Sequence, residues 1–252
     1  MTRIIVSGCF GKMGRIIIEC IKDMPECKVV GGIDVYQDSN AEFPIYKTAL
    51  DIDVAADVII DFSNPSALPG LIEYCSLKNM PLVLCTTGFS KQEIENIHNA
   101  SRKFPIFYSG NMSLGINLII ELAKQATKVF GKSADIEIIE KHHNQKIDAP
   151  SGTALMIADA ISSVLDDNIQ YVYDRHSYRK PRSKNEIGIH SVRGGTIVGE
   201  HEVIFASHDE LFTISHSAQS KEIFAVGSIN AAKYMVSKAP GLYDMSDLLS
   251  GK

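Results

Sequence analysis

Short apolar runs alternate with amphipathic stretches in the first half of the chain. The apolar runs are typical of buried strands and cover residues 4–7, 28–33, 58–62, 81–85 and 106–108. Helical patterns cover residues 15–22, 66–78 and 90–102. Because strands alternate with helices, the sequence predicts βαβ units around a parallel sheet, joined by right-handed connections.

The pattern changes after residue 112. We expect helices over residues 114–130, 153–165 and 221–236, and a strand over 135–141. Three further strands, at 188–192, 196–205 and 211–217, follow one another without helices between them. Strands in series favour a mixed or antiparallel sheet. The predicted fold class is therefore α/β, with a doubly wound, Rossmann-like parallel sheet and a smaller α+β domain.

Composition adds bounds to this picture. With 252 residues, 45% hydrophobic and 22% charged, the chain is an average globular protein of one large domain or two small ones. A net charge of −5, from 25 basic and 30 acidic residues, argues against a nucleic-acid-coating protein. The basic stretch 175–184 is expected to be a solvated loop rather than a phosphate-binding patch.

The cysteines indicate a reducing compartment. There are five, an odd number without CxxC spacing, which favours neither disulfides nor zinc; they are Cys9, Cys20, Cys27, Cys75 and Cys85. The N-terminus has no signal-peptide pattern, and apolar runs such as 116–122 are too short to span a membrane. We expect a cytoplasmic protein with no membrane partner. No metal site is expected, because HExxH is absent and residues 200–202 read as a strand with alternating faces.

A glycine-rich turn follows the first strand and opens the first helix. Gly8, Gly11 and Gly14 form GxxGxxG, a variant of the dinucleotide fingerprint. Glycines there allow a tight turn and close approach of a pyrophosphate, and the helix N-terminus attracts that anion. Asp34 lies 20 residues after Gly14, where an acid would bind the adenosine ribose. The alternative is a turn that only packs helix on strand.

The residues after Asp34 bear on the choice of cofactor. None of residues 35–38 is cationic, and the Asp34 carboxylate would repel the 2′-phosphate of NADPH. We therefore expect NADH to bind at least as well as NADPH. A more distant cation, such as Lys12 or Lys47, would weaken this discrimination.

Two further segments lie where parallel strands end. Small and hydroxyl residues at these positions suit a nicotinamide or a ribose, because ligands bind at the carboxyl ends of such strands. The segments are Cys85-Thr86-Thr87-Gly88 and Ser109-Gly110-Asn111-Met112. Ordinary turn chemistry explains the same composition, and both interpretations stay open.

Residues 137–154 contain the highest concentration of side chains that could take part in catalysis. Two histidines and a lysine, His142, His143 and Lys146, form a cationic cluster that suits an anionic substrate protonated as it is reduced. Ser151 is an expected N-cap, and Gly152 and Thr153 then offer backbone N–H groups to a carboxylate. The alternatives are a solvated histidine pair and a simple helix cap.

These residues resemble one family. The signature E-[IV]-x-E-x-H-x3-K-x-D-x-P-S-G-T-A of the 4-hydroxy-tetrahydrodipicolinate reductases, also called dihydrodipicolinate reductases, is met in full by residues 137–154. The similarity extends over essentially the whole chain, through residues 8–15, 61–63, 86–89, 111–113, 193–201 and 244–245.

The resemblance implies roles for matching residues. His142 would donate or accept a proton and Lys146 would donate one, and the sequence does not decide between them. Substrate carboxylates would be bound by His143, Gly152 and Thr153, next to Ser151. The cofactor would lie along Gly8, Cys9, Phe10, Gly11, Lys12, Met13, Asp34, Cys85, Thr86, Thr87, Ser109, Gly110, Asn111 and Met112.

The resemblance also implies an organisation and a reaction. Residues 1–112 and 220–252 would form a discontinuous dinucleotide-binding domain, and residues 113–219 a substrate domain that assembles a homotetramer. NADH or NADPH would reduce a small cyclic dicarboxylate, 4-hydroxy-tetrahydrodipicolinate, with loss of water, in the diaminopimelate route to lysine.

Three departures from the family pattern stand out. Cys85 replaces a usual glycine, Lys221 stands where relatives have a substrate-binding arginine, and Val35 replaces a basic residue found in members that use NADPH well. A lysine keeps the charge of an arginine but loses its bidentate geometry.

Other classes of protein fit less well. A thioester-forming aldehyde dehydrogenase needs a catalytic cysteine, and no cysteine follows position 85. A nucleotide-sensing regulator would need a basic recognition helix, which this acidic chain does not suggest. A cofactor-binding relative that has lost catalysis remains open.

Overall fold

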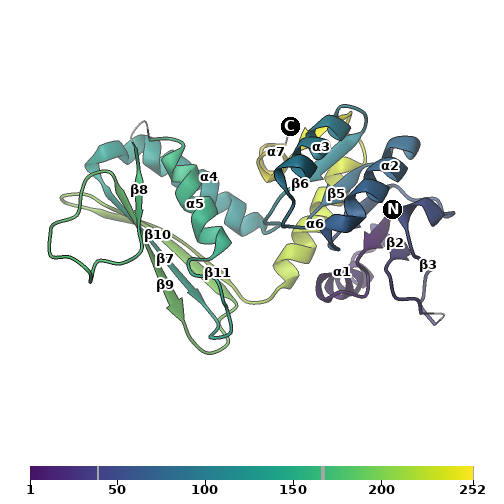
Figure 1. Cartoon of the computed structure of the whole chain (residues 1–252), viewed down its shortest axis with the longest axis horizontal. Coiled ribbons are helices and arrows are strands. Elements are labelled where there is room, and N and C mark those ends of the chain that lie inside the picture. Colours follow the sequence, from purple (N-terminus) through teal and green to yellow (C-terminus); the bar gives the residue numbers. More distant parts are fainter. Residues whose placement is uncertain (39, 166–167, 252) are drawn as a thin grey trace. The chain divides into compact units, whose positions relative to one another are not determined.

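The computed structural model describes residues 1–38, 40–165 and 168–251. The chain forms two compact units, and its path crosses between them twice. Unit 1 comprises Met1–Leu114 and Lys221–Lys252, and unit 2 comprises Gly115–Ser220. Figure 1 labels many of the strands and helices of each unit.

Unit 1 is built on a fully parallel sheet of seven strands in the order β12-β6-β5-β4-β1-β2-β3. Its strands are β1 (Thr2–Ser7), β2 (Cys27–Ile33), β3 (Ile45–Tyr46), β4 (Val58–Asp61), β5 (Leu82–Leu84), β6 (Pro105–Tyr108) and β12 (Gly241–Tyr243). The strand order reverses between β1 and β4. This is the predicted doubly wound, Rossmann-like arrangement, in which ligands bind at the carboxyl ends of the strands beside the reversal.

Helices cover both faces of the unit 1 sheet. They are α1 (Lys12–Lys22), α2 (Leu68–Lys78), α3 (Lys91–Ser101), α6 (Glu222–Met235) and the short α7 (Met245–Ser250). Apolar residues of α1 and α6 share one buried cluster with Ile4, whereas those of α2 and α3 share another with Ile5. Successive strand residues point to opposite faces, so strands covered on both sides become continuous apolar runs.

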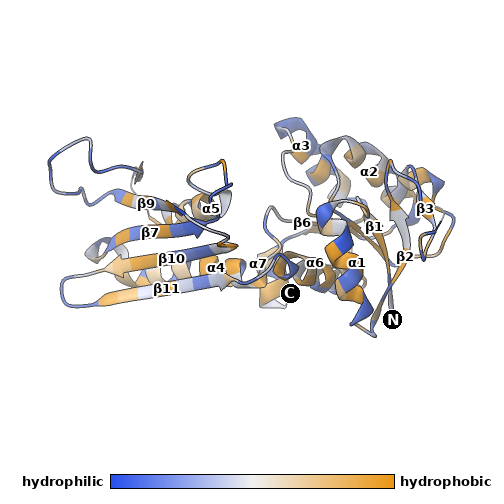
Figure 2. Cartoon of the chain, turned by 90° about the horizontal axis from the view of Figure 1, so that it is seen from below, coloured by the Kyte–Doolittle hydropathy of each residue, from blue (hydrophilic) through white to orange (hydrophobic). Residues whose placement is uncertain are grey.

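The amphipathic pattern of α1 shows how a helix meets this sheet. Figure 2 shows apolar and polar residues alternating along α1. Ile17 and Ile21, four residues apart, lie on one side of the helix and are buried in the cluster. Helix α6 packs on the same face of the sheet as α1, so the segment that follows unit 2 belongs to unit 1.

Unit 2 is a five-stranded mixed sheet in the order β11-β10-β7-β9-β8. Its elements are α4 (Leu114–Phe130), β7 (Asp135–His142), α5 (Gly152–Ser162), β8 (Gln170–Val172), β9 (Glu186–Arg193), β10 (Gly199–Ala206) and β11 (Leu211–Ala218). β10 runs antiparallel to β7 and β11, whereas β7, β9 and β8 are parallel. The predicted mixed sheet is therefore confirmed.

The core of unit 2 lies between this sheet and the two helices. Alternate residues of β7 and β10, such as Ile138 and Val203, are buried in one cluster with Ile119 of α4 and Ile157 of α5. The residues between them stay partly exposed. The expected alternation of residues 200–202 is confirmed, because His201 is buried while its two neighbours are not.

Several element bounds differ from the sequence prediction. Helix α1 begins at Lys12 rather than at residue 15, because Gly14 packs into the helix start against the glycine turn. Strand β10 begins at Gly199 rather than at residue 196, because Gly195, with φ +49°, belongs to the preceding turn. The short strands β3, β8 and β12 and helix α7 were not predicted. With two or three residues, such strands show no recognisable period.

The basic stretch 175–184 is a loop, as predicted, but two of its arginines are ion-paired. Arg175 contacts Glu137 at 2.9 Å and Glu186 at 2.8 Å, and Arg182 contacts Asp135 at 2.9 Å. These pairs fasten the loop to the sheet of unit 2.

Candidate active site

The glycine turn of unit 1 has the shape that a dinucleotide requires. Gly8 has φ +76°, and a Cβ there would lie 2.6 Å from the carbonyl oxygen of Phe62. A Cβ on Gly14 would lie 2.2 Å from the carbonyl oxygen of Gly8. Helix α1 then begins at Lys12, and its N-cap residue, Gly11, supplies no side-chain hydrogen bond. The first N–H groups of α1 therefore meet a surface kept clear of side chains, which fits a pyrophosphate.

Asp34 lies directly after β2 and holds the turn. Its carboxylate accepts hydrogen bonds from the backbone N–H groups of Phe10 at 3.0 Å and Tyr36 at 3.1 Å. A cavity of about 720 Å³ opens beside it and is lined by Phe10, Tyr36 and residues of α1. The carboxylate thus stands between the glycine turn and the loop that follows β2.

The same cavity is lined by a cation that was not predicted to bear on the choice of cofactor. Arg15 lines it, and the Arg15 Nε donates to the Phe10 carbonyl oxygen at 2.9 Å. Lys22 lines it too, whereas Lys12 and Lys47 are not among its lining residues. In the sequence, the sign of this cation was an arginine directly after the last glycine of the motif.

The two strand-end loops are held by their own polar side chains. Ser109 Oγ donates to the Asn111 carbonyl oxygen at 2.9 Å, and the Ser113 N–H donates to Asn111 Oδ1 at 3.0 Å. Gly110 and Thr87 are exposed, whereas Met112 is buried in the core. Turn chemistry therefore accounts for Ser109 and Asn111.

A buried carboxylate that was not predicted links the ends of β4 and β5. Asp61, at the end of β4, is 1% exposed and accepts hydrogen bonds from Thr86 Oγ1 at 2.6 Å and Ser63 Oγ at 2.5 Å. Burial raises the pKa of Asp61, which those hydroxyl groups oppose. The signal in the sequence was an acid at the end of an apolar run.

The cysteines of the expected cofactor site face the core. Cys9 is fully buried, and Cys85 is 5% exposed. Burial raises the pKa of Cys9 to about 11 and that of Cys85 well above the ordinary thiol value. Both residues can offer a ligand their backbone, but their thiols are neutral and inward-facing.

In unit 2, the histidine–lysine segment lies where β7 ends. His142 is the last residue of β7, and the strand register places it beside Arg193 of β9. His142 Nδ1 is 2.6 Å from Glu140 Oε2, and Arg193 makes two hydrogen bonds to the Glu140 carboxylate, at 2.7 and 2.8 Å. A carboxylate, an arginine and a histidine therefore form one connected group.

Burial and charge set the protonation of this group. Burial would raise the pKa of Glu140, but hydrogen bonds, led by that from Arg193, outweigh it and lower the pKa to about 2. Burial lowers the pKa of His142, while Glu140 opposes this effect. His142 is therefore mostly neutral near pH 7 and can exchange a proton.

Ser151 is the predicted N-cap of α5. Its Oγ accepts from the Ala154 N–H at 3.2 Å and lies 3.2 Å from Nε2 of His201. His201 is 4% exposed, its ring packs edge-on against His142 with centroids 5.3 Å apart, and burial lowers its pKa to about 4. The N-cap is thus joined to a neutral buried histidine.

The start of α5 already receives a carboxylate. Lys146 Nζ lies 2.8 Å from Asp148 Oδ1, and a hydrogen bond from the Gly152 backbone adds to the effect of Lys146 in lowering the pKa of Asp148. The Lys146 N–H donates to the His143 carbonyl oxygen at 3.1 Å, which folds the loop back on itself. This chemistry, an ammonium group and a helix N-terminus around a carboxylate, fits an acidic ligand.

The expected residues fall into two sets. His142, His143, Lys146 and the residues 151–153 lie together in unit 2 around the start of α5. The expected cofactor residues lie in unit 1, and so does Lys221, which directly precedes α6.

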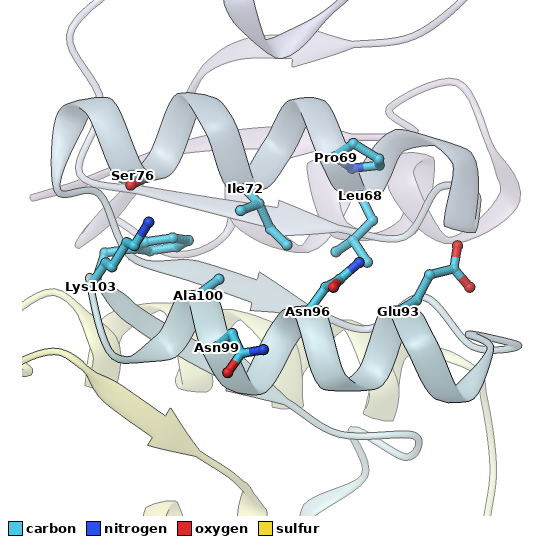
Figure 3. A pocket seen from close by; sticks show the side chains of 10 residues that line it. Leu68, Pro69, Ile72, Ser76, Glu93, Asn96, Asn99, Ala100 and Lys103 are labelled. Carbon is cyan, nitrogen blue, oxygen red and sulfur yellow. The ribbon is translucent and has the colours of Figure 1, made fainter.

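A further cavity of unit 1 contains none of the expected site residues. It is a groove of about 390 Å³ between α2 and α3, and Figure 3 shows side chains of both helices at its walls. Within residues 1–38, 40–165 and 168–251, no cluster of three or more His, Cys, Asp or Glu side chains is placed to hold a metal. The helices in this described part of the chain are all too short or too polar to span a membrane.

The fold and the site define a class of protein: a two-unit α/β protein with a doubly wound sheet of the kind that nicotinamide-dependent oxidoreductases use, and a separate unit that carries a cluster of titratable residues. Two family models match the chain, "Dihydrodipicolinate reductase, N-terminus" over residues 2–112 and "Dihydrodipicolinate reductase, C-terminus" over residues 115–249. The chain belongs to the dihydrodipicolinate reductase family.

Individual relatives agree with this assignment. The chain is 51% identical over 249 residues to a 4-hydroxy-tetrahydrodipicolinate reductase of Caldanaerobacter subterraneus subsp. tengcongensis, covering 99% of this chain and 98% of that protein. It is 50% identical to the reductase of the same name from Clostridium tetani, with the same coverage. The structure of dipicolinate-bound dihydrodipicolinate reductase from Paenisporosarcina sp. TG-14 shares the fold, with a TM-score of 0.81, 24% identity and 97% of each chain covered.

Proposed function

We propose that the chain catalyses the reduction that its relatives are named for: 4-hydroxy-tetrahydrodipicolinate loses water, and the conjugated product is reduced to tetrahydrodipicolinate, in the diaminopimelate route to lysine. The observation that carries the proposal is the group of Glu140, His142 and Arg193 beside the start of α5. It combines a titratable histidine with an anion-binding helix end, which a dicarboxylate protonated during its reduction requires.

Unit 1 would bind the nicotinamide cofactor, which supplies the hydride when bound. The glycine turn and the start of α1 would hold the pyrophosphate, and the Asp34 carboxylate would face the adenosine ribose. We expect NADH to bind at least as well as NADPH, because Asp34 repels a 2′-phosphate. Arg15 and Lys22 line the cavity beside Asp34, together with the acids Glu19, Asp38 and Glu42. Arg15 would offset part of the repulsion, so both cofactors should be accepted.

Unit 2 would bind the substrate and supply the proton. The N–H groups of Gly152 and Thr153 would bind one carboxylate, with His143 and Lys146 as cationic partners. The Lys146 ammonium pairs with the Asp148 carboxylate at 2.8 Å, which supports a carboxylate-binding role for this group. The proton would come from His142 or from Lys146, and the substrate contact expected of Lys221 stays a prediction.

The assembly would be a homotetramer formed through unit 2. The supporting feature is the side of its sheet that faces away from α4 and α5. There, Ile139 and Ile204 stay partly exposed beside a small cavity of about 210 Å³ lined by polar side chains. The five cysteines are all thiols, which suits the reducing cytoplasm, where we place the reaction.

The test is cofactor oxidation by the wild-type chain, with 4-hydroxy-tetrahydrodipicolinate generated freshly by the preceding synthase. Substrate-dependent loss of reduced-nicotinamide absorbance is expected with both NADH and NADPH. If a chain shown to bind NADH oxidises neither cofactor, the substrate assignment is wrong and a relative without catalysis remains.

Two variants then separate the proton donors. His142→Gln and Lys146→Met should each retain NADH binding, and the one that removes the donor should lower kcat by roughly 10²–10⁴-fold. His208→Gln is the matched control, since that side chain is 97% exposed on the loop after β10. Wild-type turnover in both site variants would refute the assigned roles.

A further inference from the structure

Glu140 is an ionised side chain with no access to solvent. It is 0% exposed, on the face of β7 that packs toward the helices. Arg193 binds it through two nitrogens, the Ser151 N–H donates to Oε1 at 3.2 Å, and His142 Nδ1 contacts Oε2 at 2.6 Å. A buried charge is tolerated when it is paired and hydrogen-bonded in this way.

This carboxylate decides which nitrogen of His142 carries a proton. An ionised carboxylate only accepts hydrogen bonds, so Nδ1 must donate to it. In the neutral ring the proton therefore lies on Nδ1, and Nε2 carries the lone pair. The Nε2 edge lies over Gly199 of β10, where a Cβ would come within 3.1 Å of Nε2.

We propose that Glu140, held by Arg193, is a positioning residue that fixes the tautomer and ring orientation of His142, so that Nε2 is the atom that exchanges the proton. The proposal rests on the function proposed above. In the reaction, the Nε2–H bond of protonated His142 breaks and its proton bonds to the substrate atom next to the carbon that receives hydride. The ring is left neutral with its Nδ1–H on Glu140, and bulk solvent reprotonates Nε2.

The same strand contains a matched control. Glu137 of β7 also joins an arginine and a histidine: its Oε1 lies 2.9 Å from Arg175, and its Oε2 lies 2.8 Å from His190 Nε2. Its side chain is 23% exposed and lies on the opposite face of β7 from Glu140, where it also pairs with Arg182 at 3.6 Å. Glu137→Gln therefore removes an equivalent structural link but not the proposed function.

The first measurement needs neither a variant nor turnover. The ¹⁵N shifts of His142 in the wild-type chain are expected to show the Nδ1–H tautomer near neutral pH. An Nε2–H tautomer would overturn the proposal even if the reductase activity is confirmed. Because this readout does not use the substrate, a failure of the proposed function would leave it intact.

The second measurement compares Glu140→Gln with Glu137→Gln. Glu140→Gln should lower kcat by roughly 10²–10⁴-fold at a nearly unchanged KM, whereas Glu137→Gln should keep the wild-type kcat. The charged groups around His142 are Glu140, Lys146 and Arg193, with His201 packed against its ring. Glu140 raises the pKa of His142, whereas burial, Lys146 and Arg193 lower it, so loss of Glu140 should move the alkaline limb of the kcat profile to lower pH.

A merely structural Glu140 would give a different pattern. Both variants would then lose stability but keep the wild-type pH profile, and this result would refute a positioning role. Gly199→Ala tests the Nε2 edge of His142 without removing the hydrogen bonds among Glu140, Arg193 and His142. Its Cβ should push the His142 ring and lower kcat with the Nδ1–H tautomer retained; unchanged kcat would contradict the proposed use of the Nε2 edge.

Discussion

His201 makes the stability of unit 2 depend on pH in a way that can be calculated. The ring is 4% exposed, and burial lowers its pKa from 6.5 to about 4. The unfolded chain binds a proton on this residue below pH 6.5, whereas the folded chain does so only near pH 4. The folded state is therefore at its most stable with respect to His201 above pH 6.5, and it loses stability relative to the unfolded state as the pH falls from 6.5 toward 4.

The size of the loss follows from the two pKa values. Between pH 8 and pH 5, the folded state should lose about 2 kcal/mol relative to the unfolded state through His201 alone. The pKa values of His142 and His216 are also lowered by burial, so they act in the same direction and steepen the wild-type dependence. The effect of His201 alone is therefore obtained by comparing wild type with His201→Gln in the free energy of unfolding that each loses between pH 8 and pH 5.

The assay is urea unfolding followed by circular dichroism at a series of pH values. His201→Gln should be less stable than wild type at pH 8 but should lose about 2 kcal/mol less on acidification to pH 5. His208→Gln, which alters an exposed histidine, should keep the wild-type dependence. If wild type and His201→Gln lose the same free energy, then His201 is not a neutral buried group and the reasoning fails.

Two predictions concern the cofactor unit. Asp34→Ala should raise the ratio of kcat/KM with NADPH to that with NADH by roughly tenfold, since about 1.4 kcal/mol of repulsion is removed. Asp209→Asn removes a 92% exposed carboxylate of unit 2 and should leave this ratio unchanged; equal ratios in all three proteins would contradict the role of Asp34. Gly8→Ala should abolish NADH binding and destabilise the fold by roughly 1–3 kcal/mol, both measurable by calorimetry. The reason is that Gly8 has φ +76° and the new Cβ would lie 2.6 Å from the carbonyl oxygen of Phe62. Gly70→Ala, with open space around a helical glycine, should instead stabilise by roughly 0.5–1 kcal/mol.

The local pattern of apolar residues was sufficient to predict those helices that bury one long face and those strands that form one continuous apolar run. Helix α4 spans residues 114–130, the predicted bounds, because its apolar residues recur at helical spacing over many turns. β12 shows the opposite case. It has three partly exposed residues, and only pairing with β6, more than 130 positions earlier in the sequence, makes Gly241–Tyr243 a strand.

The site shows the same division. Ser151 as N-cap could be predicted, since a cap uses residues three positions apart. The pairing of Arg193 with Glu140 could not, because 53 residues separate them and the parallel register of β7 and β9 brings them together. Asp61 and Thr86, 25 residues apart, meet for the same reason at the ends of neighbouring strands.

The two acids of the sequence signature show why residue type alone does not identify a site. Glu137 and Glu140 lie on one strand, and each joins an arginine to a histidine. Their side chains are 23% and 0% exposed, so water screens the first group and not the second. An unscreened carboxylate can hold one tautomer of its histidine against exchange with solvent, and a screened one does so only weakly. The difference arises from the packing of α4 and α5 on one face of the sheet, which the signature residues do not encode by themselves.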